Sequence, residues 1–309
     1  MKKSDLRSDL LLCTVKFLSP PYMKFLRIFF IVFCSSLLLA ACAKDNSSDN
    51  VDIPVLGNST YSNRTNAQRQ ISRSFVIAHR GYWDSDNPQN SLSSMKRALL
   101  LEIYGTEMDI HQTKDGIIIV NHDPTYHGLS IKNSSYEELS KYTLSNGEPI
   151  PLFESFLQVK KDIGGSVKLI VELKDCNVID LLSLIDSYGL QSEVEFISFS
   201  INLCNQLVNL GYGYKTYYLG GNISPVDIKA KGYGGIDYSD SSYSSYPDWI
   251  QNAQNIGLRT IVWTVNNTDK IINYVQQGVL VTTDKPVEAS AACNNLKGDE
   301  TGIQQVTTH

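Results

Sequence analysis

The chain has 309 residues, of which 42% are hydrophobic, and it carries a formal net charge of -5. This length allows one large domain or two small ones, and the apolar fraction is enough to fill a substantial core. The modest negative charge and the lack of any Lys/Arg run exclude nucleic acid as an expected partner.

The first 42 residues have the pattern of an export signal rather than of a folded segment. A short basic stretch at 23–27 precedes apolar residues 28–39, which are too few to span a bilayer comfortably. Residues 39–42, Leu-Ala-Ala-Cys, resemble the cleavage site of a bacterial lipoprotein signal. The resemblance implies cleavage before Cys42, lipidation of Cys42, and export to a bacterial outer membrane or cell envelope that holds the lipid anchor. The alternative is an ordinary secretory signal cut nearby.

Residues 43–73 are predicted to be a flexible tether, because the polar run at 44–50 has no apolar period and cannot bury surface. From residue 74 onward, short runs rich in Val, Ile, Tyr and Phe alternate with amphipathic segments. The strand-like runs are residues 75–79, 105–110, 117–122, 167–173, 194–199, 214–219, 234–238, 259–265 and 279–283. Among the segments between them, apolar residues fall at helical spacing in 91–103, 178–188 and 269–277.

This alternation predicts a parallel α/β sheet, either a closed TIM (β/α)8 barrel or an open doubly wound sheet. Nine runs are one more than a barrel holds, and a tight turn at 113–116 indicates that 106–112 and 117–122 pair antiparallel. Which runs close the barrel is left open by the sequence. The barrel is favoured because polar residues end many different runs, whereas an open sheet would gather them at one crevice. It is predicted to span residues 74–290, with 291–309 as a C-terminal tail.

The stretch from Pro124 to Leu152 is expected to be a short insertion after the third strand-like run. It contains a predicted small helix at 135–142 and a turn at Asn146-Gly147. Two interpretations remain open, an excursion over the mouth of the barrel and an ordinary surface loop.

Polar residues at the ends of the early runs form a catalytic set rather than a packing one. His79 and His122 close two β-branched runs, and Arg80 follows His79 directly. Glu107 and Asp109 lie two residues apart on a third run, so their carboxylates face the same way. Acids between apolar neighbours on a core strand need a partner, which argues against a merely solvated strand face.

These residues belong to motifs that occur in a fixed order along the chain. The motifs are Ala78-His79-Arg80-Gly81, Asn90-Ser91, Glu107-x-Asp109, Thr113-x-Asp115-Gly116, His122-Asp123, Glu172-Leu173-Lys174, Val262-Trp263-Thr264-Val265-Asn266 and Thr283-Asp284-Lys285-Pro286. Together they resemble the glycerophosphodiester phosphodiesterase family over about residues 74–290. The resemblance implies a TIM barrel, a small glycerophosphodiester as substrate, and one divalent metal as cofactor, Ca²⁺ or Mg²⁺.

The resemblance also implies a role for each matched residue. The implied metal ligands are Glu107, Asp109 and Glu172, all carboxylates of the kind that a hard cation prefers. The implied general acid–base pair is His79 and His122. The implied phosphate contacts are Arg80 and Lys174.

One position departs from the family pattern, because the usual Pro-Glu-Asn is replaced by Pro88-Gln89-Asn90. An amide oxygen can still bind a cation or accept a hydrogen bond, but the site loses one negative charge. The expected consequences are a weaker metal affinity, a different preferred metal or an altered substrate. Gln89, Asn90 and Trp263 are therefore further candidate site residues, with Trp263 equally suited to packing.

The expected activity is metal-dependent hydrolysis of glycerophosphodiesters to glycerol 3-phosphate and an alcohol, with the two imidazoles moving the protons. Two alternatives stay open. A phospholipase C-like or D-like phosphodiesterase on the same barrel would be favoured by an apolar rim around the mouth. A non-catalytic phosphodiester-binding lipoprotein has Gln89 as its only support.

Overall fold

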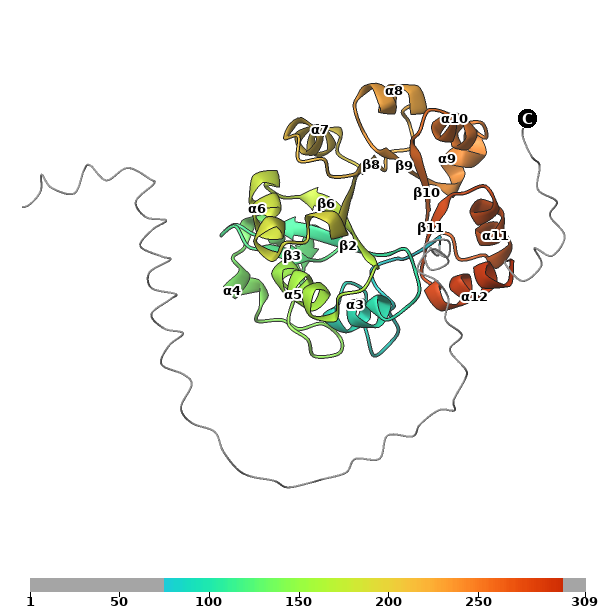
Figure 1. The fold of residues 1–309 in the computed structure, drawn as a ribbon. Helices are drawn as coiled ribbons and strands as arrows, with labels where there is room; N and C mark the ends of the chain where they lie inside the picture. The colour runs from blue at the N-terminus through green and yellow to red at the C-terminus, as the bar shows by residue number, and fades with distance from the viewer. Residues whose placement is uncertain (1–74, 297–309) are drawn as a thin grey trace, which may run out of the picture. The chain divides into compact units, whose positions relative to one another are not determined.

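The computed structural model describes residues 75–296 and places them in one closed barrel of parallel strands (Figure 1). The strands of the barrel are β1 (Val76–Ala78), β2 (Gly105–Gln112), β6 (Lys168–Asp175), β7 (Val194–Ser198), β8 (Thr216–Tyr218), β9 (Gly235–Ser239), β10 (Arg259–Trp263) and β11 (Leu280–Thr283). Each strand pairs with the next, and β1 pairs with both β2 and β11. This double pairing of β1 closes the barrel, so the predicted TIM barrel is confirmed and the open sheet is excluded.

The ninth strand-like run of the sequence lies beside the barrel and not in it. It forms β3 (Ile118–Val120), which pairs antiparallel with the end of β2 in the register Ile110 to Val120. The turn between them places Gly116 at φ 85°, a conformation that glycine adopts without strain. The predicted antiparallel pair is therefore confirmed, and it resolves the mismatch between nine runs and eight barrel positions.

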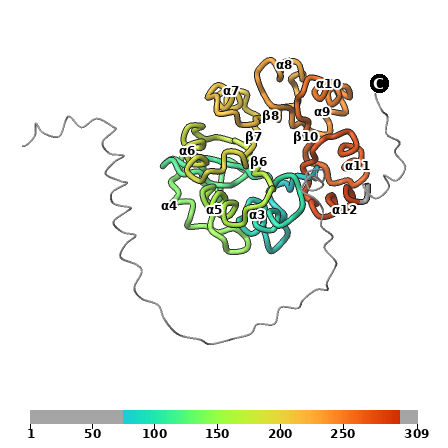
Figure 2. Tube along the Cα trace, viewed as in Figure 1, coloured from blue at the N-terminus to red at the C-terminus, as the bar shows by residue number. Residues whose placement is uncertain are grey.

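Helices surround the strands as an outer ring, and the colour gradient runs once around this ring in chain order (Figure 2). They are α3 (Leu92–Leu99), α5 (Phe153–Ile163), α6 (Val178–Tyr188), α7 (Ile201–Asn209), α8 (Pro225–Ala230), α9 (Asp240–Ser245), α10 (Trp249–Asn255), α11 (Thr268–Gln276) and α12 (Pro286–Leu296). Side-chain caps fix several helix starts, as when Asn177 accepts hydrogen bonds from the first turn of α6. The helix predicted at 91–103 starts at the expected Ser91 cap but ends at Leu99, because the chain then turns into β2.

Alternation along each strand divides the apolar residues into two cores. Residues that point outward, such as Val76 and Ala78, pack against the helices in the larger core. Residues that point inward, such as Ile77, Ile170 and Ile261, fill the interior of the barrel. Polar side chains that also point inward therefore lie at the ends of the strands, above the packed apolar interior of the barrel.

The insertion between β3 and α5 has a small core of its own. It contains the two-stranded pair β4 (Thr125–Tyr126) and β5 (Leu129–Ser130), a 3-10 turn at Ile131–Asn133, and the short helix α4 (Tyr136–Leu139). Its buried apolar residues are Ile119, Tyr126, Ile131, Leu139 and Ile150.

Contacts of the insertion place it beside the barrel mouth. Glu148 accepts hydrogen bonds from the backbone of Leu92 and Ser93 at the start of α3, and Lys132 forms an ion pair with Asp175 at the end of β6. Both contacts lie where barrel strands end. The insertion is thus a packed subdomain at the edge of the mouth and not an ordinary surface loop.

Several predictions concern residues outside the described range of 75–296. These are the signal region 1–42 with Cys42, the tether 43–73, and most of the tail. Helix α12 continues to Leu296, past the boundary at 290 predicted for the end of the barrel. Within the described range, no helix is both long and apolar enough to cross a bilayer.

A glycine-to-alanine pair tests how tightly the strands pack. A Cβ atom on Gly235 would meet the backbone carbonyl oxygen of Arg259 at 2.1 Å, whereas a Cβ atom on Gly234 would meet its nearest neighbour at 3.5 Å. We expect Gly235→Ala to lower the free energy of unfolding by about 1–3 kcal/mol or more, because backbone cannot move aside as a side chain can. Gly234→Ala is the control, and equal thermal unfolding of both variants would contradict the packing described.

Candidate active site

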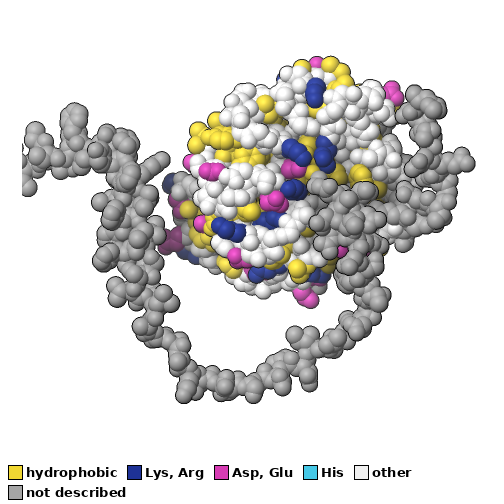
Figure 3. Space-filling view, in the orientation of Figure 1, with side chains coloured by type: hydrophobic (Ala, Val, Ile, Leu, Met, Phe, Trp, Pro, Cys, Tyr) yellow, Lys and Arg dark blue, Asp and Glu magenta, His cyan; other side chains and the backbone are white. Residues whose placement is uncertain are grey.

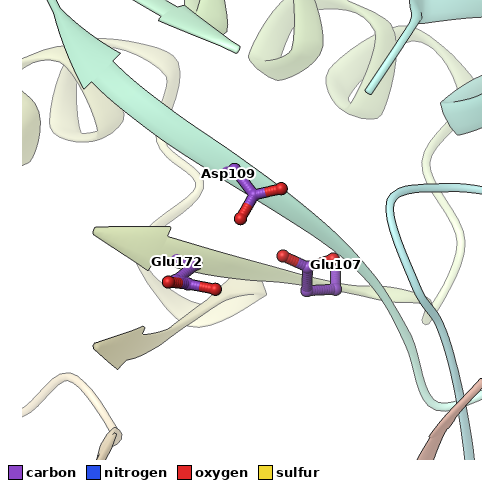
Figure 4. Close-up of side chains that lie close together, drawn as sticks. All are labelled: Glu107, Asp109 and Glu172. Carbon is purple, nitrogen blue, oxygen red and sulfur yellow. The ribbon is translucent and has the colours of Figure 1, made fainter. Parts of the chain in front are cut away.

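Three buried carboxylates lie together where β2 and β6 approach the mouth of the barrel. Glu107 and Asp109 project from β2, and Glu172 projects from the neighbouring strand β6, directly opposite Asp109 in the strand register (Figure 4). Each residue has a carboxylate oxygen within 4.8 Å of those of the other two. Spacing of two along β2 therefore places Glu107 and Asp109 on one face, as the sequence predicts, and strand pairing adds Glu172.

Burial and mutual repulsion shift the pKa values of these acids. Burial, with the charges of Asp109 and Glu172, raises the pKa of Glu107 well above its ordinary value. Burial and the charge of Asp109 raise the pKa of Glu172 to about 7. Burial alone would also raise the pKa of Asp109, but Lys174, the Asn90 amide and Arg80 hold it below its ordinary value. Asp109 is thus the acid whose charge the protein itself stabilises.

Two cations partly neutralise the three acids. Lys174 Nζ lies 3.1 Å from Asp109 Oδ1 and 2.5 Å from Glu172 Oε1. Arg80 Nε lies 3.3 Å from Asp109 Oδ2. Burial would lower the pKa of Lys174, but Asp109 and Glu172 outweigh this and raise it, so the ammonium stays charged. Both side chains that the sequence predicts as phosphate contacts therefore border the carboxylates.

The loop after β1 is held in place by the same acids. The backbone N–H of Arg80 donates to Glu107 Oε2 at 2.8 Å. Asn90 Nδ2 donates to Asp109 Oδ2 at 2.8 Å, and Asn90 Oδ1 accepts from the backbone N–H of Asp109 at 3.2 Å. Arg80 and Asn90 both have positive φ angles, 56° and 60°, which non-glycine residues adopt at a cost. The predicted site residue Asn90 therefore positions Asp109 and the loop.

The side chain of Gln89 is hydrogen-bonded to Arg80 and not to the three clustered carboxylates. Arg80 Nη1 donates to Gln89 Oε1 at 2.8 Å. An amide at this position binds the guanidinium through a neutral hydrogen bond, where a glutamate would form an ion pair. The departure from the family pattern thus removes a negative charge from beside Arg80, while the amide still orients the guanidinium.

His79 is oriented by a carboxylate from the last strand of the barrel. Its Nδ1 lies 2.7 Å from Asp284 Oδ1, and Asn266 Nδ2 donates to Asp284 Oδ2 at 2.7 Å. Burial would raise the pKa of Asp284, but the hydrogen bonds from His79 and Asn266 hold it below its ordinary value. An ionised Asp284 fixes Nδ1 as the protonated nitrogen and leaves Nε2 to exchange a proton. The sequence placed Asp284 in a motif without assigning it this role.

His122 follows β3 and is more exposed than His79, with 42% of its side chain accessible. Its Nδ1 lies 2.8 Å from Asp123 Oδ1, so it too has an acidic partner. The buried ring of His111 reaches the backbone carbonyl of His122 through Nε2, at 3.3 Å. Burial lowers the pKa of His111, which therefore supports the His122 segment as a neutral group.

Aromatic residues cover the other side of the mouth. Trp263, at the end of β10, donates from Nε1 to the backbone carbonyl of Asp237 at 2.9 Å. The exposed ring of Phe199 packs edge-on against it, with ring centroids 5.6 Å apart. Because β7 and β10 are separated by two strands, this pair spans the ends of β8 and β9.

The side chains of Tyr238 and Tyr243 lie away from the mouth of the barrel. Tyr238 belongs to β9 and Tyr243 to α9, and both are buried in the outer core. Their hydroxyls donate to the backbone carbonyls of Ile223 and Ile261. They neither line the mouth nor form a surface loop, since alternation along β9 turns Tyr238 toward the helices.

The donor set at the mouth fits one hard divalent cation. All three clustered groups are carboxylates, which Ca²⁺ and Mg²⁺ prefer as ligands. Three acids face only two cations there, Arg80 and Lys174, and the raised pKa values of Glu107 and Glu172 show that positive charge is in deficit. Glu107, Asp109 and Glu172 would hold the ion.

A parallel barrel with acidic, basic and imidazole groups at its C-terminal end defines a TIM-barrel enzyme. The model of the glycerophosphoryl diester phosphodiesterase family matches residues 79–288. The chain belongs to this family, and it is a phosphodiesterase by class.

Individual relatives agree with this assignment. A glycerophosphodiester phosphodiesterase from Caldanaerobacter subterraneus is 27% identical, and the match covers 69% of this chain and 95% of that protein. The crystal structure of a glycerophosphodiester phosphodiesterase from Parabacteroides distasonis is 32% identical with a TM-score of 0.68, over 72% of this chain and 97% of that one. A phosphodiesterase from Oleispira antarctica, solved in complex with sn-glycerol-3-phosphate, shares the fold at 21% identity and a TM-score of 0.59, over 74% of this chain and 99% of that one.

The raised pKa of Glu172 predicts how pH affects the metal-free protein. Its folded-state pKa, about 7, exceeds the ordinary 4.5, so the folded state disfavours the ionised form. The contribution of Glu172 to stability is complete below about pH 4.5 and is lost as the pH rises through about 7. In EDTA, we expect the melting temperature of the wild type to fall more between pH 5 and 8 than that of Glu172→Gln. Identical pH profiles in EDTA would contradict the repulsion between Glu172 and Asp109.

Proposed function

We propose that the chain hydrolyses glycerophosphodiesters to glycerol 3-phosphate and an alcohol, in a reaction that depends on one divalent metal ion. The observation that carries the proposal is the buried cluster of Glu107, Asp109 and Glu172, bordered by Arg80 and Lys174. A phosphodiester anion needs positive charge on its phosphoryl oxygens, and this cluster is the place where a cation and two basic side chains come together.

The basic residues Arg80 and Lys174 bind the phosphate of the substrate. Arg80 donates from Nη1 to Gln89 and lies in ion-pair contact with Asp109, and its other guanidinium donors would bind a phosphate oxygen. Lys174 adds a point charge from β6. Ca²⁺ or Mg²⁺, when bound by the three carboxylates, would neutralise charge that develops on the phosphoryl oxygens.

The two histidines, His79 and His122, transfer the protons. His79 Nε2 can exchange a proton because Nδ1 is held by Asp284, and His122 is held in the same way by Asp123. One imidazole accepts the proton of the attacking hydroxyl, and the other donates a proton to the leaving oxygen. The attacking group is the neighbouring hydroxyl of the substrate, which gives a cyclic phosphate that water then opens. Direct attack by water is the rival route, and trapping of a cyclic product separates the two.

The departure at Gln89 does not favour a non-catalytic role. Its amide contacts Arg80, whereas both histidines, the three acids and Lys174 retain their matched positions. The lipid anchor belongs to the proposal as well, because the signal pattern that ends at Cys42 supports an exported, membrane-attached enzyme.

Replacement of the histidines tests the activity. We expect His79→Ala and His122→Ala each to lower the rate of glycerol 3-phosphate release by about 10²–10⁴-fold, the usual contribution of a positioned acid or base. The assay uses glycerophosphocholine, glycerophosphoethanolamine and glycerophosphoinositol, with His127→Ala in the insertion as the control. If neither substitution at 79 or 122 lowered the rate, the acid–base pair would be refuted.

Removal of the charge on Asp284 tests how His79 is oriented. We expect Asp284→Asn to lower kcat at least about tenfold, because an amide no longer fixes Nδ1 as the protonated nitrogen. The binding of metal, measured by calorimetry, should stay unchanged, since Asp284 lies outside the carboxylate cluster. Asp227→Asn on the exposed helix α8 is the control. An unchanged kcat in Asp284→Asn would refute the role of Asp284.

Substitution of Cys42 tests the anchor. We expect Cys42→Ser, expressed in a bacterial host, to move the protein from the membrane fraction to the soluble fraction and to abolish labelling with radioactive palmitate. Cys176→Ser, at a buried position of the barrel, is the control. Membrane association that survives Cys42→Ser would show that another segment holds the protein.

A further inference from the structure

The end of the barrel opposite the carboxylates carries a second hollow, of about 590 Å³. Its lining comes from residues at or just before the starts of barrel strands, among them Phe75, Lys215, Arg259 and Leu280. Parallel strands all begin at one end of a barrel, so this hollow lies at the end away from His79 and Glu172. Nothing in the proposed hydrolysis uses it.

A buried glutamate closes the interior of the barrel beneath this hollow. Glu195 accepts hydrogen bonds through Oε1 from the hydroxyl of Tyr104, at 2.8 Å, and from Lys215 Nζ, at 3.3 Å. Its Oε2 accepts from the hydroxyl of Tyr217 at 2.8 Å. Burial and the charge of Glu195 raise the pKa of Tyr217, so this phenol remains a donor. Both oxygens of Glu195 are therefore satisfied without Arg259.

Within residues 75–296, Arg259 lines the hollow with a positive charge that no carboxylate pairs. Its guanidinium lies 5.2 Å from the centroid of the Tyr104 ring, which holds the side chain in place by a cation–π contact. No carboxylate pairs with Arg259 within residues 75–296. A preorganised guanidinium presents a planar fork of donors that matches the oxygens of a carboxylate or a phosphate.

We propose that this hollow binds a small organic anion, whose phosphate or carboxylate contacts Arg259 and Lys215. The volume is within the range of small-molecule sites, and Phe75 and Leu280 offer apolar surface to the organic part. On the face shown in Figure 3, Lys and Arg side chains near the centre are interspersed with Asp and Glu side chains. This proposal goes beyond the hydrolysis and does not depend on it.

Calorimetric titration of the full chain with inorganic phosphate, in EDTA at low ionic strength, tests the site. We expect Arg259→Gln to weaken phosphate binding at least about tenfold, since the variant loses a charge-assisted hydrogen bond. Arg259→Lys should retain part of the affinity, which separates lost charge from lost folding. Lys270→Gln, which removes a surface ion pair with Asp240, is the control and should bind as the wild type does.

Three further measurements separate this site from others. Lys174→Ala at the mouth should leave binding to the second hollow intact, and glycerophosphocholine hydrolysis by Arg259→Gln should match the wild type. Acetate in place of phosphate shows which oxyanion binds more tightly. The proposal is overturned if neither anion binds, if Arg259→Gln binds as the wild type does, or if Arg259 matters only for sedimentation with phosphatidylglycerol vesicles.

Discussion

The structure depends most on the burial of three carboxylates at one place in a closed barrel. Glu107, Asp109 and Glu172 repel one another in surroundings that exclude water, and this burial and repulsion raise the pKa values of Glu107 and Glu172. Much of the surrounding sequence offsets this repulsion, through Lys174, the Arg80 side chain and a backbone N–H. Even the strained backbone of Arg80 and Asn90 is stabilised by bonds to these acids. In the proposed function a divalent cation would complete the neutralisation, so that loop geometry, charge balance and catalysis would share one physical cause.

Much of the fold could be predicted because local pattern and global fold agree. Short β-branched runs alternate with amphipathic segments, and each strand-like run became a strand. The closure of the barrel could not be predicted, because it depends on β1 pairing with both β2 and β11, and pairing between distant segments leaves no trace in local periodicity. The helix at 91–103 was predicted too long for a related reason, since the apolar residues Leu101, Ile103 and Tyr104 lead into β2 and do not extend the helical stripe.

Site residues within a strand were predictable, whereas partners from distant strands were not. Spacing of two placed Glu107 and Asp109 on one face, and the family resemblance supplied Glu172 and Lys174. Asp284 lies 205 residues from His79, and only the closure of the barrel brings the two together. The motif Thr283-Asp284, at the end of the last strand-like run, was the signal that could have suggested this contact. Phe199 carried no motif and was missed for that reason.

The tyrosines at 238 and 243 show the limit of composition as evidence. Ser and Tyr dominate residues 238–246, a composition typical of a loop, yet Ser239 caps helix α9 and the rings of Tyr238 and Tyr243 turn toward the helices. At the opposite end of the barrel, Arg259 escaped notice because a single arginine at a strand start has no distinctive pattern. Within residues 75–296 no carboxylate pairs with Arg259, because the neighbouring Glu195 accepts its hydrogen bonds from Tyr104, Tyr217 and Lys215.

The most direct test of this account measures whether the activity depends on a divalent metal and whether Asp109 binds that metal. Purified protein is stripped with EDTA, and the rate of glycerol 3-phosphate release from glycerophosphocholine is followed as Ca²⁺ or Mg²⁺ is added back. The account predicts no release without metal and full recovery at one ion per chain. For Asp109→Asn it predicts that a much higher metal concentration is needed to restore the rate, because this variant loses the acid that the protein keeps ionised. Full activity in EDTA, or recovery in Asp109→Asn at the same metal concentration as in the wild type, would contradict it.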